Sequence, residues 1–191
     1  MRMNILAAAL VACALAVPAF ADDDMDTLIA ESRAAIKGFG ANLKAELVSA
    51  IEAGGPEHAI GVCNMAAPGI AADRSVAFEG RVGRTSLKRR NAANAPDGWE
   101  LAVLEDFEAR KAAGADIKAL DHAEIVTENG QRIFRYMKAI PTAQVCTNCH
   151  GTDLKPEVSA MIDDLYPTDQ ARGFSAGDIR GAFTLRKVLE N

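Results

Sequence analysis

Residues 122–140 read HAEIVTENGQRIFRYMKAI, and this stretch decides the fold of the chain. Asn129-Gly130 lies between two runs with strand character, residues 122–128 and residues 131–140. Asn-Gly is the pair that two-residue hairpin turns favour, because both central residues of the turn need positive φ. We therefore expect two antiparallel strands joined by a tight turn.

Three helices are predicted ahead of this hairpin, over about residues 23–54, 57–73 and 99–113. Apolar side chains in the first of them recur with the spacing of one helix face and alternate with charged residues. The Gly-Gly-Pro sequence at residues 54–56 is expected to end this helix, and Pro68 to kink the next one. The chain should therefore begin with a long amphipathic helix that is followed by a sharp turn.

The remaining segments differ in their composition. The basic stretch 81–90 is predicted to be extended, and residues 178–189 alternate well enough to form a final strand. Residues 155–165 are expected to form a short helix, and residues 167–177 a polar loop. Helices and strands in this order predict an α+β fold, and the length suits one domain with a core of its own.

Directly after the hairpin lies the sequence Cys146-Thr147-Asn148-Cys149-His150. Two cysteines separated by two residues and followed at once by histidine form the attachment motif of c-type haem. The two thiols add across the haem vinyl groups, and the adjacent histidine falls under the iron as its proximal ligand. The predicted cofactor is one covalent haem c, held by Cys146 and Cys149 and bound through its iron to His150.

Paired cysteines also serve as redox dithiols of the thioredoxin kind and as halves of zinc sites. A zinc site needs about four ligands, and the sequence contains no second cysteine pair. A thioredoxin-like active site normally follows the first strand, whereas this motif lies late in the chain. Haem c is therefore the favoured interpretation, and the N-terminus supports it.

The N-terminus has the pattern of a cleaved export signal. A positively charged start and an apolar run precede an Ala-Phe-Ala site at residues 19–21. We expect residues 1–21 to be a signal peptide and residues 22–191 to be a haem-c-binding domain in a periplasm-like compartment, where haem c is attached. Lipidation of Cys13 is the second choice, because the apolar stretch before Cys13 is very short and continues past it.

Charge and hydropathy narrow the choice of partners. The formal net charge is −5, which argues against nucleic acid as a partner. Apart from the export signal, no segment of the sequence is long and apolar enough to predict a membrane span.

A second axial ligand would decide whether the iron transfers electrons, binds a gas or switches. Cys63 is the one cysteine besides the pair that remains after cleavage, and its spacing fits a ligand and an inert core residue equally well. Met137 lies on the strand that leads into the haem motif, although a core role is the simpler interpretation. The other candidates are His58, His122, Met65 and Met161, each better explained as a structural or surface residue.

The basic stretch 81–90 has two interpretations. Charged side chains commonly protect an exposed edge strand, and arginines also bind carboxylates such as the haem propionates in a bidentate manner. We expect a mixture of both roles, with Arg84 as the propionate partner.

Six blocks of sequence, taken together, are more specific than the haem motif alone. They are Val62-Cys63 with Ala66-Ala67-Pro68; Gly83-Arg84-Thr85-Ser86-Leu87-Lys88; Asn94-Ala95-Pro96-Asp97 with Trp99-Glu100; Arg135-Tyr136-Met137-Lys138; Cys146 to Gly151; and Tyr166-Pro167 with Gly177-Asp178-Ile179-Arg180-Gly181. With these blocks the chain resembles, over nearly its whole mature length, the PAS-like, single-haem c-type family of exported proteins and bacterial sensor domains.

This resemblance implies a PAS-like antiparallel sheet with flanking helices and a long N-terminal helix. It also implies His/Cys axial ligation, with His150 proximal and Cys63 distal. One departure is Ala139, where the family pattern has proline at or near this position, and this change should not touch the site.

The family resemblance favours a sensor of redox state or of a small gaseous ligand, which passes its signal to a partner protein. A periplasmic electron-transfer cytochrome c is the alternative, and the two differ in whether the iron ligands change on reduction. An enzyme is the third choice, since no distal histidine motif stands out. The first helix could mediate a homodimer, although packing on its own sheet is the simpler expectation.

Overall fold

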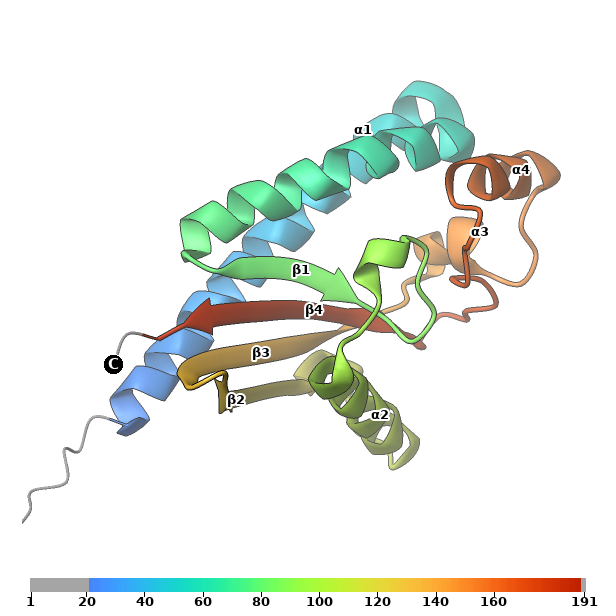
Figure 1. Ribbon diagram of the computed structural model, residues 1–191. Helices are drawn as coiled ribbons and strands as arrows, with labels where there is room; N and C mark the ends of the chain where they lie inside the picture. Colours follow the sequence, from blue (N-terminus) through green and yellow to red (C-terminus); the bar gives the residue numbers. More distant parts are fainter. Residues whose placement is uncertain (1–20, 190–191) are drawn as a thin grey trace, which may run out of the picture.

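The computed structural model describes residues 21–189 (Figure 1). Residues 1–20, which include Cys13 and nearly all of the predicted signal peptide, lie outside this range. Within the described residues no helix combines the length and the apolar character that a membrane span requires.

A four-stranded, fully antiparallel sheet forms the centre of the fold, with the strand order β1-β4-β3-β2. The predicted hairpin is confirmed: Glu128 pairs with Gln131, and Asn129 and Gly130 both have positive φ, 51° and 79°. The final strand is also confirmed, and it inserts between the hairpin and the first strand. The strands are β1 (Arg81–Thr85), β2 (Asp121–Glu128), β3 (Gln131–Pro141) and β4 (Ile179–Val188).

The N-terminal helix α1 (Ala21–Phe78) is two helices joined at Gly54 and Gly55, where the backbone leaves helical geometry. Gly55 has a φ of 77°, which glycine adopts without strain. The chain reverses here, so the two halves run side by side along the sheet (Figure 1). The predicted break at residues 54–56 is confirmed, while the second half continues through Pro68 to Phe78 instead of ending near residue 73.

The two faces of the sheet bury different clusters because side chains alternate along each strand. Phe134 and Tyr136 of β3 pack with Phe39 of α1, and each of these side chains is at most 1% exposed. Met137 is fully buried on the other face, where it packs against helix α2 (Gly98–Ala112). This confirms an α+β fold with helices flanking an antiparallel sheet.

Helix α2 begins with a capping box, a sequence signal for a helix start. The Glu100 amide donates to Asp97 at 2.8 Å, and the Asp97 amide donates to the Glu100 carboxylate at 3.0 Å. This helix confirms the third predicted one. The basic stretch departs from prediction, because its extended part ends at Thr85, after which Ser86 bends the chain by accepting from the amide of Lys88 at 3.2 Å.

Candidate functional site

The cysteine motif lies on a single tight turn at the end of β3. A short 3₁₀ segment leads into helix α3 (Thr147–His150), followed by helix α4 (Pro156–Leu165). Cys146 and Cys149 are three residues apart on consecutive helical turns, so their side chains share one face. Neither cysteine is fully buried. Cys149 packs against the cluster formed by α1 and α4, which includes Ile60 and Ile162.

The ring of His150 is oriented by a backbone carbonyl. Nδ1 of His150 lies 2.8 Å from the carbonyl oxygen of Ala171. Because a carbonyl only accepts, Nδ1 carries the proton and Nε2 is left with a free lone pair. Burial, together with the charges of Arg180 and Arg90, lowers the pKa of His150 well below its usual value. The ring is therefore neutral at physiological pH, as a metal ligand must be.

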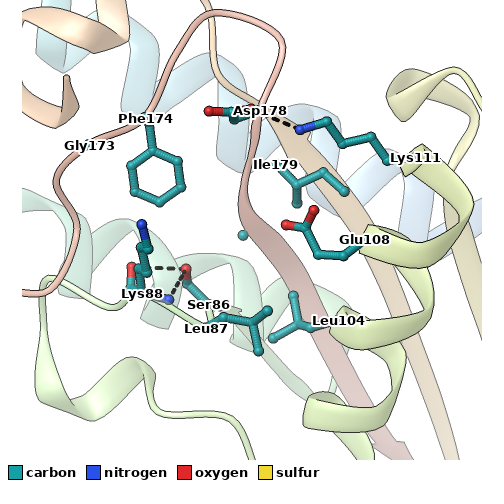
Figure 2. Close-up of a pocket in the computed structure, with 11 residues that line it drawn as sticks. Ser86, Leu87, Lys88, Leu104, Glu108, Lys111, Gly173, Phe174, Asp178 and Ile179 are labelled. Atoms are coloured by element: carbon teal, nitrogen blue, oxygen red, sulfur yellow. Dashed lines mark hydrogen bonds and ion pairs between the residues drawn. The ribbon is translucent and has the colours of Figure 1, made fainter. Parts of the chain in front are cut away.

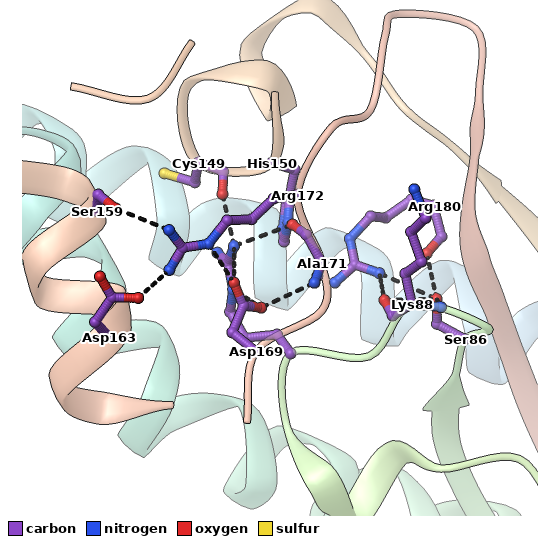
Figure 3. A network of polar contacts seen from close by, with 11 residues as sticks. Ser86, Lys88, Cys149, His150, Ser159, Asp163, Asp169, Ala171, Arg172 and Arg180 are labelled. Atoms are coloured by element: carbon purple, nitrogen blue, oxygen red, sulfur yellow. Dashed lines mark hydrogen bonds and ion pairs between the residues drawn. The ribbon is translucent and has the colours of Figure 1, made fainter. Parts of the chain in front are cut away.

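A buried ion-pair network holds the segment that carries Ala171 (Figure 3). Nε of Arg90 donates to Asp169 at 3.0 Å, and Nε of Arg172 donates to the other oxygen of the same carboxylate at 2.8 Å. The Ala171 amide also donates to Asp169 at 3.0 Å. Burial would raise the pKa of Asp169, but these hydrogen bonds outweigh it and hold the pKa below its usual range. Asp169 thus remains ionised between two arginines.

Cys63 lies on the second half of α1, beside the cysteine motif. Burial raises the pKa of its thiol above the usual value, and the positive charge of Arg84 offsets this only in part. Burial raises the pKa of the Cys149 thiol, and a thiolate on Cys63 would raise it further, so the two thiols lie within electrostatic range of each other. The structure therefore brings Cys63 to the same region as the motif, although the two lie far apart in the sequence.

Three of the other candidate ligands are either exposed or packed outside the apolar cluster that contains Cys149. His122 stacks obliquely on Trp99, with ring centroids 5.6 Å apart. Met65 is 76% exposed, and Met137 is enclosed between β3 and α2. Met161 packs in the same apolar cluster as Cys149.

Two arginines near the motif have no carboxylate partner among the described residues. Arg84 stacks over the ring of Phe39, 5.5 Å from its centroid, and makes no ion pair there. Arg180 donates to Ser86 Oγ and to the Lys88 carbonyl, yet its buried Nε has no hydrogen-bond partner. Burial and the charges of Arg90 and Arg84 lower the pKa of Arg180 to about 10.

Buried cations without anions are unfavourable, so this arrangement favours an anionic group at the site. The two propionates of haem have the required charge. Together with paired cysteines and a neutral His150, the donor set fits haem c. In the described part of the chain, no three His, Cys, Asp or Glu side chains come close enough to hold a bare metal ion.

Two hollows flank Phe174, whose ring packs edge-on against His150 at 6.2 Å between centroids. The smaller, of about 220 Å³, is shown in Figure 2, where Lys88 points toward Phe174 and Lys111 pairs with Asp178 at 2.8 Å. The larger, of about 550 Å³, runs along α3 and is polar, with Gly151 and Thr152 in its lining. The ring that packs against His150 thus also lines both hollows, and His150 itself is half-buried.

The sequence predicted no role in the site for Asp169, Ala171 and Phe174, which lie in the predicted polar loop. Their roles depend on contacts with Arg90 and His150, so no local sequence pattern indicates them. The loop itself was predicted correctly, and the adjoining Tyr166-Pro167 block was the nearest available signal.

The fold and the site together define a class: a small α+β protein with a cysteine-pair–histidine motif attached to the end of an antiparallel hairpin. The family model of the Tll0287-like proteins matches residues 16–187, and the chain belongs to this family. This match confirms the family resemblance inferred from the sequence blocks.

A solved structure, the cyanobacterial heme-protein Tll0287, shares the fold with a TM-score of 0.62. It is 22% identical and covers 89% of this chain and 98% of its own. The comparison with curated proteins gave no match.

Proposed function

We propose that this chain is a periplasmic c-type haem protein that senses redox state or a small ligand. Cys146 and Cys149 hold one haem through thioether bonds, with His150 and Cys63 as the axial ligands. The observation that carries the proposal is the His150 ring directly after the cysteine pair: it is neutral, its Nδ1–H donates to the carbonyl oxygen of Ala171, and its Nε2 is free. The relationship to a solved heme-protein supports it.

When bound, haem supplies an iron that cycles between ferric and ferrous states and a coordination position that accepts diatomic gases. His150 presents Nε2 in a fixed orientation. Cys63 supplies an anionic thiolate, which favours the ferric state and lowers the potential. Arg84 lies close enough to Cys63 to stabilise that thiolate, and its lack of a carboxylate partner among the described residues also suits the predicted contact with a propionate.

The sensor function rests on where Cys63 is attached. The second half of α1 carries Cys63 and packs on both β1 and α4, since Ile60 and Ile70 contribute to two different clusters. Release of Cys63 on reduction by a one-electron donor protein would remove one constraint on this helix and open a position for a gas such as CO or NO. A shift of α1 against the sheet then carries the signal to a partner protein.

Electron transfer is the alternative function, and one observation favours it. Val145, next to the cysteine pair, is 52% exposed, and neither cysteine is buried. An exposed apolar residue beside a haem edge would suit transient docking of a redox partner. This function requires the same two axial ligands in both oxidation states, whereas the sensor requires a change.

Export is part of the proposal. Residues 1–21 are a signal peptide and residues 22–191 the haem-binding domain, in the compartment where haem c is attached. An intact mass of protein purified from the periplasm decides between cleavage after Ala21 and lipidation of Cys13.

Expression together with a haem-c maturation system tests the cofactor assignment. We expect haem that stays with the polypeptide on a denaturing gel, and its loss in the double variant Cys146→Ala/Cys149→Ala. The matched control is Cys63→Ala, which removes the third cysteine and should keep the covalent haem. A wild-type protein that carries no covalent haem would refute the proposal.

A further inference from the structure

The carbonyl oxygen of Ala171 receives two hydrogen bonds rather than one. Nδ1–H of His150 donates to it at 2.8 Å, and Nη2 of Arg90 donates to it at 3.2 Å. The same Nη2 donates to the carbonyl of Cys149 at 2.6 Å. Arg90 therefore bridges the backbone of the cysteine motif and the acceptor that orients its histidine.

We propose that Arg90 is a positioning residue that tunes how strongly His150 donates to the iron, and thereby raises the midpoint potential of the haem. This inference rests on the proposed function. It assigns Arg90, one of the residues of the basic stretch 81–90, a role different from binding a propionate.

The physical reason lies in the shared acceptor. A carbonyl oxygen has two lone pairs, so it accepts from both donors at once. A metal-bound imidazole becomes more electron-donating when its other N–H meets a strong acceptor. The guanidinium draws electron density from the Ala171 oxygen and so weakens it as an acceptor for His150. A less donating His150 stabilises ferric iron less, which raises the potential.

Arg90 is well placed to act in this manner because it is itself fixed. Its side chain is 12% exposed, and its Nε binds Asp169, whose side chain is 2% exposed. Arg90 has five donors in a rigid fork, and the structure uses this fork on a carboxylate and two carbonyls at once. A lysine in its place has one nitrogen and cannot reach all three acceptors with the same geometry.

Other contacts hold the loop without Arg90. The amides of Gly173 and Phe174 donate to the carbonyls of Gly151 and His150 at 3.0 and 2.9 Å. Arg172 remains bound to Asp169 and to Ser159 Oγ, each at 2.8 Å (Figure 3). A substitution of Arg90 should therefore alter the acceptor of His150 and leave the loop in place.

The test compares Arg90→Gln and Arg90→Lys with the matched control Arg172→Gln in the haem-loaded protein. Arg172 binds the same carboxylate but contacts neither Ala171 O nor Cys149 O, so its loss reports on the network alone. Midpoint potentials come from spectroelectrochemical titration, and the iron–histidine vibration of the ferrous protein comes from resonance Raman. We expect Arg90→Gln to lower the potential and raise the vibrational frequency, Arg90→Lys to do both to a smaller extent, and Arg172→Gln to stay near wild type.

Wild-type values in both Arg90 variants would overturn the inference, as would an equal shift in Arg172→Gln. Should Arg90→Gln fail to accumulate, Arg90→Lys decides alone, since an unchanged potential and vibration there contradict the role of the fork. Covalent haem is measured first on every sample. A wild-type protein without covalent haem refutes the proposed function. A haem-loaded protein whose midpoint potential does not change when Arg90 is replaced refutes only the role of Arg90.

Discussion

The guanidinium of Arg180 stacks over the ring of Phe174, 5.2 Å from its centroid, and Phe174 in turn packs edge-on against His150. Arg180 is thus a cation one aromatic ring away from the predicted iron ligand. Its charge contributes to the lowered pKa of His150, after burial itself. Among the described residues it forms no ion pair, and Asp169 offsets its charge only at longer range.

Replacing Arg180 with glutamine should lower the midpoint potential of the haem. A cation near the iron disfavours the more positive ferric state, and a site of low polarity screens this effect weakly. Arg186→Gln is the control, because Arg186 lies on the same strand but pairs with Glu128 at 2.8 Å, away from the motif. If the midpoint potentials of Arg180→Gln and Arg186→Gln are equal, the charge of Arg180 does not influence the iron.

Asp121 links α1 to the sheet, and this link should fail in acid. Its carboxylate accepts from Tyr136 at 2.7 Å and from Arg33 at 2.8 Å. Burial would raise the pKa of Asp121, but these hydrogen bonds outweigh it and lower the pKa below its usual value. A lowered folded-state pKa contributes stability above about pH 4, and this contribution is lost as the pH falls through the folded pKa.

Asp121→Asn should therefore be less stable than wild type by roughly 1–2 kcal/mol at pH 7, with the gap closing in acid. Urea unfolding of the haem-loaded protein over this pH range measures it. Asp106→Asn is the control, since Asp106 pairs with Arg110 on an exposed helix face, where an ion pair contributes little to stability. A gap for Asp121→Asn that is constant with pH would contradict the assignment.

Gly181 should not tolerate a side chain. Its φ is 153°, and a Cβ there would collide with the carbonyl oxygen of Thr85 and with the side chain of Ser86, both in the segment that lies alongside. Gly181→Ala should cost about 1–3 kcal/mol in unfolding free energy. Gly83→Ala on the adjoining strand is the matched control, because its Cβ would meet only Thr184 Cγ2 at an ordinary 3.8 Å. Equal stability of the two variants would show that the strand relaxes at Gly181.

Features of the fold that depend only on residues close together in the sequence were predictable. The Asn129-Gly130 turn needs only its own two residues and the alternation on each side, and the break at residues 54–56 needs only its glycines. The strand order was not predicted, because β4 pairs with β1 and β3 through contacts that are remote in sequence. The end of the extended basic stretch at Thr85 was missed, since the bend that follows depends on hydrogen bonds of Ser86.

The site likewise has features that were predictable from the sequence and features that were not. The motif from Cys146 to His150 is contiguous and visible in the sequence, whereas the orientation of His150 depends on the remote Ala171. Spacing alone left Cys63 evenly balanced between core and ligand. The resemblance favoured the ligand, and the structure places Cys63 near Cys149. The burial of Asp169 between two arginines has no signal in the sequence, because charged loop residues are usually exposed.

Low-temperature EPR of the ferric, haem-loaded protein tests the central claim most directly. The comparison uses wild type, Cys63→Ala and the control Met65→Ala, whose side chain is exposed on the same helix. Ligation by His150 and Cys63 predicts a low-spin thiolate signal in wild type and Met65→Ala that disappears in Cys63→Ala. A spectrum of Cys63→Ala that equals that of wild type would contradict the account, and Cys63 would then be an apolar packing residue of α1.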